Sequence, residues 1–136
     1  NSLILAARLT GMELVLCSPA EEQPDRALYA GCSNVSWEAD PMKAAAGVDY
    51  FYTDVWVSMG FEEERERRMK LFAPYQVNEK LFSVAKPDAK FLHCLPAHRG
   101  EEVSAGVMDD PKRSIVFDEA ENRLHVQKAV MAMLMK

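Results

Sequence analysis

The stretch DYFYTDVW, residues 49–56, decides the fold class. It is rich in aromatic and β-branched residues, which favour a pleated and half-buried backbone, and it therefore predicts a β-strand. Before it stands DPMKAAAG, residues 40–47, a helix pattern with an aspartate cap, an early proline and a closing glycine. After it stands FEEERERRMKLF, residues 61–72, whose acid–base pairs four residues apart support a helix. The centre of the chain thus predicts a strand with a helix on each side.

The same alternation continues toward both ends of the chain. Further strands are predicted over residues 12–18, 34–39, 89–95 and 113–117, and further helices over 2–10, 24–31, 78–85 and from Glu119 to the end. Alternating strands and helices form βα units, so we expect an α/β fold: a doubly wound parallel sheet with helices on both faces, a Rossmann-like three-layer sandwich. Open sheets more often start with a strand, whereas this chain opens on a helix, so we expect the sheet to lack its first strand.

Length, composition and charge exclude several kinds of protein. The 136 residues suffice for one domain with a buried core, and 49% hydrophobic and 27% charged residues are ordinary for a globular protein. A net charge of −5 argues against a nucleic-acid partner, since phosphate binding needs a basic face. No apolar run approaches the roughly 18–20 residues that span a bilayer, so we expect no membrane partner either. Three cysteines without CxxC spacing favour reduced thiols and a cytoplasmic location.

Reactive side chains stand where the predicted strands end, and a parallel sheet binds its ligands beyond the carboxyl ends of its strands. Asp54 follows the aromatic strand, Cys94 closes the strand over residues 89–95, and Arg123 stands in the first turn of the final helix. A carboxylate, a thiol and a guanidinium at one sheet edge suit a small polar substrate. No GxGxxG motif follows any predicted strand, which excludes a nicotinamide-binding domain.

Three segments, in this order and spacing, carry a family resemblance: DVWVSMG (54–60), HCLPAHRGEEV (93–103) and FDEAENRLHVQKAVMAML (117–134). Together they resemble the second, ornithine-binding half of an ornithine carbamoyltransferase, and the resemblance covers essentially the whole chain. The cysteine in HCLP separates the chain from aspartate carbamoyltransferases, which place a proline there, and the SMG turn favours ornithine over its acylated relatives. The resemblance implies transfer of a carbamoyl group from carbamoyl phosphate to the δ-amine of L-ornithine, giving L-citrulline and phosphate.

The resemblance also implies what surrounds the reaction. The family uses neither a metal nor an organic cofactor. Its carbamoyl-phosphate domain is missing from residues 1–136, which we expect to form the ornithine-binding domain and to be inactive by themselves. The family builds trimers, so we expect a homo-oligomer. A non-catalytic amino-acid-binding or interaction module on the same fold stays open as the alternative.

Substrate-binding roles follow from the resemblance position by position. Asp54 would hold an amine of ornithine, while Ser58 and the backbone around Met59 would grip the amino-acid end of the substrate. Cys94 would lie against the δ-amine, with the Leu95 carbonyl near the carbamoyl NH₂ group. A cationic amine needs a carboxylate, which supports the role of Asp54 on physical grounds.

Cys94 and Arg123 carry the expected catalytic roles. Arg123 would bind the carbonyl oxygen that gains negative charge as the amine attacks, and a developing oxyanion needs such a preorganised donor. The attacking amine must be neutral, and an ionisable Cys94 thiol beside it could help to set its protonation. We expect Asp54, Cys94 and Arg123 to converge on one cleft at the carboxyl edge of the sheet.

The neighbours of Cys94 in the HCLP turn are expected to be structural. His93 and Pro96 support the turn, and we expect a cis Leu95–Pro96 peptide bond, because the family turns its backbone carbonyls into the site there. Cys94 with His93 and His98 could bind zinc adventitiously, but a structural zinc site needs four ligands, so no metal site is expected.

The final helix carries apolar residues on two faces, although a surface helix needs only one stripe. Val126, Val130, Met133 and Leu134 line one face, and Leu124, Met131 and Met135 line another. In the family this helix crosses back to the carbamoyl-phosphate half. We therefore expect it to leave an apolar patch exposed, to cover the patch with another copy of the chain, or to fray beyond Ala129. Self-association is the expected outcome.

Overall fold

The computed structural model describes residues 1–57 and 64–135. Its helices, in chain order, are α1 (Ser2–Thr10), α2 (Pro41–Ala44), α3 (Arg65–Phe72), α4 (Glu79–Phe82), α5 (Ala105–Met108) and α6 (Val116–Leu134). Its strands are β1 (Leu14–Cys17), β2 (Val35–Glu38), β3 (Tyr50–Thr53) and β4 (Lys90–His93), and single 3₁₀ turns lie at Ala20–Glu22, Arg26–Leu28 and Ala73–Tyr75. Strands alternate with helical segments, as predicted, and the fold is α/β.

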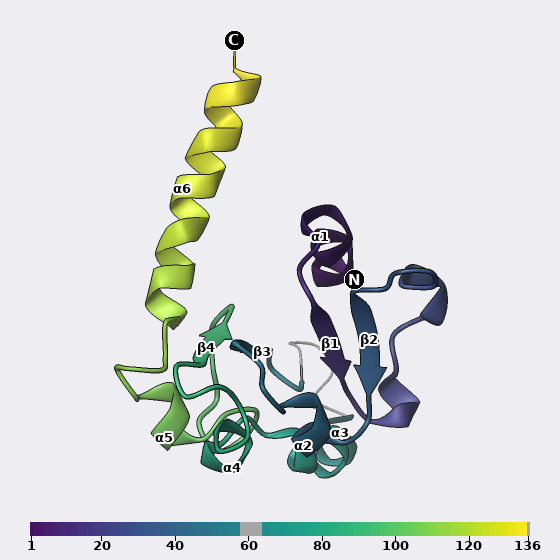
Figure 1. Cartoon of the computed structure of the whole chain (residues 1–136). Helices are drawn as coiled ribbons and strands as arrows, with labels where there is room; N and C mark the ends of the chain where they lie inside the picture. The colour runs from purple at the N-terminus through teal and green to yellow at the C-terminus, as the bar shows by residue number, and fades with distance from the viewer. Residues whose placement is uncertain (58–63, 136) are drawn as a thin grey trace.

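The strands form two parallel pairs. β1 pairs with β2, Leu14 opposite Val35, and β3 pairs with β4, Thr53 opposite His93. Across the view of Figure 1 the strands follow one another in the order β2, β1, β3, β4. A doubly wound sheet has the order 3-2-1-4-5, so the observed order matches its second to fifth strands. The position between β1 and β3 is taken by no strand of the described residues, and the sheet therefore appears as two halves.

The larger core lies around β3 and β4. Phe51 of β3 packs on Phe82 of α4, with ring centroids 4.5 Å apart, and Phe91 of β4 is fully buried. Val107 of α5 and Val116 at the start of α6 belong to the same buried cluster. Burial stabilises by about 25 cal/mol per Å² of apolar surface, so this cluster fixes the β3–β4 pair firmly.

The smaller core lies between α1 and the other strand pair. Ile4 and Ala7 of α1 pack with Val35 of β2. Helix α1 ends as predicted at Gly11, whose φ of 76° is the left-handed conformation that glycine adopts without steric cost. The chain can therefore turn from α1 directly into β1.

The predicted strand over residues 113–117 is wrong. Within the described ranges a single parallel bridge forms there, between Ser114 and Phe91, and the Ile115 N–H donates to the Phe91 carbonyl before the chain turns into α6. Val116 is buried at the start of that helix, whereas Phe117 is 76% exposed. A buried and an exposed apolar residue side by side imitate the alternation of a strand.

Two shorter elements also differ from the prediction. The helix predicted over residues 24–31 is reduced to a 3₁₀ turn at Arg26–Leu28, whose cap is Asp25. Helix α5 is not predicted at all, because it has only four residues; it begins after Ser104, whose hydroxyl oxygen accepts the Val107 N–H. Such single-turn helices are too short to show a helical period in the sequence.

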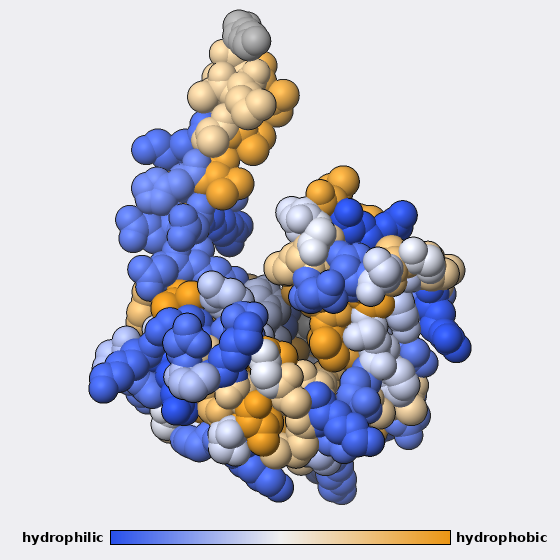
Figure 2. Space-filling model, viewed as in Figure 1, coloured by the Kyte–Doolittle hydropathy of each residue, from blue (hydrophilic) through white to orange (hydrophobic). Residues whose placement is uncertain are grey.

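Helix α6 rises away from the rest of the molecule (Figure 1), and Val116 is its buried residue. Figure 2 shows hydrophobic side chains gathered toward its far end. The exposed apolar residues of the helix are Phe117, Leu124, Val126, Val130, Met131, Met133 and Leu134. The predicted exposed patch is confirmed, and fraying beyond Ala129 is wrong, because the helix continues to Leu134. Self-association stays a prediction.

The helices of the described ranges differ from helices that span a membrane. None of them combines the length and the apolar character that crossing a lipid bilayer requires. α6, with 19 residues, is the longest described helix, but charged residues are spread along its first half.

Candidate functional site

Asp54 and Cys94 meet where two paired strands end. β3 and β4 run parallel with Thr53 opposite His93, so the residue after each strand emerges at the same edge. The Cys94 S–H donates a hydrogen bond to Asp54 Oδ1 over 3.2 Å. Both residues are exposed, so a small molecule can reach the pair. The structure thus brings two of the predicted site residues together.

The surroundings of Cys94 favour its protonated form. Partial burial of its sulfur raises the pKa of Cys94, and the hydrogen bond to Asp54 raises it further, while a hydrogen bond with Tyr52 acts in the opposite direction. The pKa of Tyr52 is also raised, first by burial and then by its hydrogen bond with Cys94. These surroundings therefore favour a neutral thiol that donates to Asp54 Oδ1. The expectation of a thiol that ionises to set the amine's protonation does not fit these surroundings.

The HCLP turn follows β4 directly. Its Leu95–Pro96 peptide bond is cis, as predicted. Leu95 has a φ of 58°, the left-handed conformation, which costs a non-glycine residue roughly 1–2 kcal/mol. The Leu95 N–H donates to His93 Nδ1 over 2.9 Å, and this hydrogen bond offsets part of that cost. The turn therefore places the Leu95 backbone beside the Asp54–Cys94 pair.

His93 turns its side chain into the core. The side chain is fully buried, and its Nε2 lies 3.2 Å from Oε1 of the equally buried Glu102. The backbone N–H of His93 donates to Glu119 Oε2 over 2.9 Å, which joins the end of β4 to the base of α6. This burial agrees with the structural role predicted for His93.

Arg123 lies on α6, one turn beyond Glu119. Residues four apart share a helix face, so Arg123 is on the side of α6 whose Glu119 binds the end of β4. The sequence predicted Arg123 in the first turn of this helix. That placement is wrong, because the helix begins at Val116 and Arg123 lies about two turns further on. Arg123 is exposed. Its convergence with Asp54 and Cys94 stays a prediction.

Ser58 and Met59, predicted to grip the substrate, lie outside the described residues. Sequence reasoning also misses three residues of this strand edge. Tyr52 shares a hydrogen bond with Cys94, Glu119 accepts the His93 N–H, and Glu102 contacts the His93 ring. Tyr52 precedes Asp54 by two positions, and the period of a strand could have placed both on one face. Glu102 offers no such signal in the sequence, because the adjacent Glu101 is identical in type yet pairs at the surface with Arg65.

The zinc set considered from the sequence does not assemble. Within residues 1–57 and 64–135, the donor atoms that do come close are those of His98, Glu101 and Glu102, within 4.8 Å of one another. Glu101 is already paired with Arg65, and Glu102 accepts hydrogen bonds from His93 and from the His98 backbone. We assign no metal to this group.

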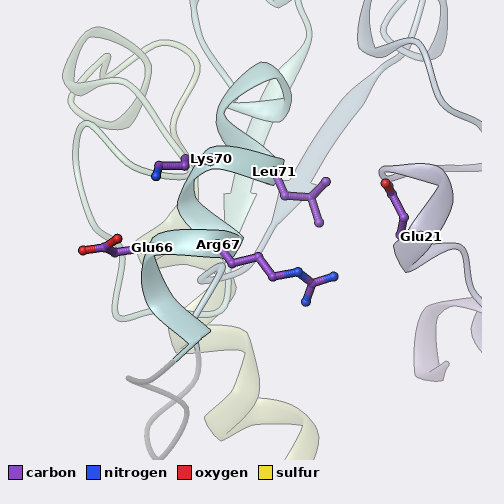
Figure 3. A pocket seen from close by; sticks show the side chains of 5 residues that line it. All are labelled: Glu21, Glu66, Arg67, Lys70 and Leu71. Carbon is purple, nitrogen blue, oxygen red and sulfur yellow. The ribbon is translucent and has the colours of Figure 1, made fainter.

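A hollow of about 670 Å³ lies beside α3, on a different part of the surface (Figure 3). Its lining residues are Glu21, Glu66, Arg67, Lys70 and Leu71. Arg67 and Leu71 point toward Glu21, whereas Glu66 and Lys70 point away (Figure 3). The lining includes none of the predicted site residues, and its charges are mixed, so we assign it no function.

The domain is Rossmann-like, and one strand edge presents a carboxylate, a thiol and a cis-proline turn. These features are those of a small-molecule-binding domain of the α/β class. The model of the family "Aspartate/ornithine carbamoyltransferase, Asp/Orn binding domain" matches residues 1–134, and the chain belongs to this family.

Named relatives and a solved structure agree with the family match. The chain is 51% identical over 139 residues to the ornithine carbamoyltransferase of Geobacillus stearothermophilus, which covers 96% of this chain and 44% of that protein. It is 50% identical over 143 residues to the ornithine carbamoyltransferase of Pyrococcus abyssi. That match covers 99% of this chain and 45% of the relative. The structure of ornithine carbamoyltransferase from Pyrococcus furiosus superposes with a TM-score of 0.86 at 47% identity, covering 96% of this chain and 44% of that one. The chain thus spans less than half the length of these relatives.

Proposed function

We propose that residues 1–136 are the ornithine-binding domain of an ornithine carbamoyltransferase. The enzyme to which they belong passes the carbamoyl group of carbamoyl phosphate to the δ-amine of L-ornithine and forms L-citrulline and phosphate. The observation that carries this proposal is the contact between the Cys94 thiol and Asp54 Oδ1 at the shared end of β3 and β4. The family match over residues 1–134 and the 51% identity to a named relative support the choice of substrate.

Asp54 supplies the charge that recognises ornithine. Its exposed carboxylate can form a charge-assisted hydrogen bond with a protonated amine, which is stronger than a bond between neutral groups. Ser58 and the backbone of Met59 hold the amino-acid end of the substrate; their roles rest on the family resemblance alone. Ornithine is thereby held by its amino-acid end, and its δ-amine is free to react.

Cys94 orients the amine that attacks. The hydrogen of the thiol is directed to Asp54, so the lone pairs of the sulfur remain free to accept a hydrogen bond from the δ-amine. The nitrogen lone pair then points at the carbamoyl carbon. In the reaction the N–C bond forms, the bond from that carbon to the phosphate oxygen breaks, and one proton of the amine passes to the leaving phosphate.

Leu95 and Arg123 act on the carbamoyl group. The Leu95 carbonyl accepts a hydrogen bond from the carbamoyl NH₂. Arg123 donates to the carbonyl oxygen, which becomes negative as the amine attacks, and a fixed cation stabilises that charge most in the transition state. No metal and no organic cofactor takes part, because the group passes directly between two bound substrates.

Carbamoyl phosphate requires a site for its phosphate, which we assign to a carbamoyl-phosphate domain outside residues 1–136. The chain is therefore inactive by itself and acts within a homo-oligomer, a trimer in the family. The proposed location is cytoplasmic. All three cysteines, Cys17, Cys32 and Cys94, are free thiols, which supports a reducing compartment.

A non-catalytic module on the same fold is the second candidate. The exposed apolar residues of α6 favour it, since an exposed apolar surface of this kind suits a protein partner. Such a module would bind ornithine, or a partner, without forming citrulline.

The test uses this chain joined to the carbamoyl-phosphate half of a relative, which we term the completed enzyme. L-ornithine is titrated into it by calorimetry with and without carbamoyl phosphate, and citrulline is measured in parallel. We expect ornithine binding that strengthens with a non-reacting carbamoyl-phosphate analogue, citrulline formation with carbamoyl phosphate, and a strong decrease of both in Asp54→Asn. Binding without citrulline would favour the module, and absence of both in the unsubstituted protein would contradict the assignment.

A further inference from the structure

Beneath the HCLP turn lies a buried pair that the proposed reaction does not use. The side chains of His93 and Glu102 are fully buried, with His93 Nε2 3.2 Å from Glu102 Oε1. Oε1 also accepts the His98 backbone N–H, whereas Oε2 has no hydrogen-bond partner among the described residues. A buried carboxylate is costly, and the contact that faces its Oε2 is the His98 imidazole, whose Nδ1 lies 3.8 Å away. The shortest side-chain contact of Glu102 is the one with the buried His93 imidazole.

The hydrogen bonds of the imidazole fix the position of its proton. The Leu95 N–H donates to His93 Nδ1 over 2.9 Å, so Nδ1 must carry the lone pair. The proton of the neutral ring then sits on Nε2, which donates to Glu102 Oε1. The other tautomer would set two N–H groups against each other at Leu95 and would leave the carboxylate facing a lone pair. Glu102 therefore selects one tautomer.

The selected tautomer holds the turn that carries the site. Leu95 follows Cys94 and has a φ of 58°, and its N–H is bonded to the side chain two residues before it. This is the pattern by which a side-chain acceptor stabilises a turn in place of the backbone. The dihedral angles of Leu95 set the direction of its own carbonyl. The same turn fixes the backbone from which the Cys94 thiol reaches Asp54 over 3.2 Å.

We propose that His93 and Glu102 are positioning residues of the carbamoyl-transfer site, an inference that rests on the proposed function. Glu102 selects the Nε2–H tautomer of His93, and His93 Nδ1 then holds the Leu95 N–H. The Leu95 carbonyl and the Cys94 thiol are thereby kept in place for the carbamoyl NH₂ and the δ-amine. Both positioning side chains are fully buried and act through the Leu95 backbone, without moving a proton.

The tautomer can be measured directly on this chain by long-range ¹H–¹⁵N correlation of its histidine rings. We expect a neutral His93 ring protonated at Nε2, and a mixture of tautomers in Glu102→Met. A His93 ring that is protonated at Nδ1, or at both nitrogens, in the unsubstituted chain would overturn the inference. This measurement does not involve carbamoyl transfer, so it separates a failure here from a failure of the proposed function.

Two matched variants test the consequence in the completed enzyme. Asparagine and leucine have nearly the same shape, but only asparagine can accept an N–H from two residues further on. We expect His93→Leu to lower kcat about 10²-fold without changing the KM for carbamoyl phosphate, since a misplacement of about 1 Å can cost that much. His93→Asn should recover most of the loss. Equal losses in both variants, at equal thermal stability, would overturn the inference.

Thiol alkylation gives a second measurement for variants with weak activity. Iodoacetamide labels the cysteines of the chain, and mass mapping compares Cys94 with Cys17, which lies on the other strand pair. We expect the ratio of the two rates to change several-fold in His93→Leu and to stay near the original ratio in His93→Asn. The same ratio in all three proteins would show that His93 does not hold the turn.

Discussion

The two parallel strand pairs are built alike and differ in what their ends can do. Each brings a cysteine to its carboxyl end: Cys17 is the last residue of β1, and Cys94 follows β4. The β3–β4 pair belongs to a cluster of eleven buried hydrophobic residues, whereas the β1–β2 pair has a cluster of three, both counted among the described residues. The better-anchored pair is the one that carries the candidate site.

The neighbours of the two thiols explain the difference in their chemistry. Burial raises the pKa of Cys17 to about 11, and the charges of Glu38 and Asp40 contribute to the rise. The pKa of Cys94 is also raised by burial, but its S–H is directed at one carboxylate, Asp54, over 3.2 Å. A thiol can orient a substrate when its hydrogen has a fixed acceptor and its strand is firmly packed. The residue type by itself is not enough.

The largest effect should come from the core behind the candidate site. Phe91→Ala removes a fully buried ring from β4 and should lower the free energy of unfolding by about 3–5 kcal/mol. Val35→Ala in the smaller cluster removes two methyl groups and should cost less than half as much. Urea titrations with an unchanged m-value provide the measurement. Similar losses in the two variants would show that the two pairs are equally anchored.

The next effect concerns the two carboxyl edges. Asp54→Asn in the completed enzyme removes the acceptor of the Cys94 thiol and the charge for ornithine, and it should lower kcat/KM for ornithine about 10²-fold. Glu38→Gln, at the end of β2, is the matched control, because glutamine can still accept the Asp40 N–H that Glu38 binds over 2.9 Å. Steady-state kinetics would contradict the assignment if both variants lost activity to the same degree.

A smaller effect is expected in the titration of the two thiols. Because both pKa values are raised, both cysteines should be alkylated more slowly at pH 8 than a free cysteine, and both rates should increase as the pH rises. Asp54→Asn removes a negative acceptor and should lower the pKa of Cys94, so its rate at pH 8 should increase several-fold. The rate of Cys17 should stay unchanged, and its half-maximum should lie near pH 11.

Strands β3 and β4, and the site residues Asp54 and Cys94 that follow them, can be predicted from the sequence for a simple reason. Paired parallel strands end at the same edge, so Asp54 and Cys94 must be neighbours once both strands are recognised. Glu102 cannot be found in this way, because an acid next to another acid gives no sign of which one is buried. The start of α6 at Val116 is missed for a related reason. The exposed Phe117 looks like an apolar strand position in the sequence, so a strand is predicted there.

The smallest effect should come from a contact that joins the two pairs. Arg68 of α3 pairs with Glu22, which follows β1, over 3.3 Å. Glu22→Gln should lower the free energy of unfolding by about 0.2–1 kcal/mol, and the loss should shrink in roughly 1 M salt. Thermal unfolding at low and high salt provides the measurement. A loss as large as that of Phe91→Ala would mean that this ion pair, and not the cores, holds the pairs together.

The projection of α6 turns a small movement at its base into a large one at its tip. Its 19 residues extend about 28 Å, at a rise of roughly 1.5 Å per residue. Glu119, near the base, holds the backbone of His93 at the end of β4. A rotation of about 5° at that point would displace the far end by about 2.5 Å, by the same helix length. The helix is a lever arm, and its fulcrum lies beside the candidate site.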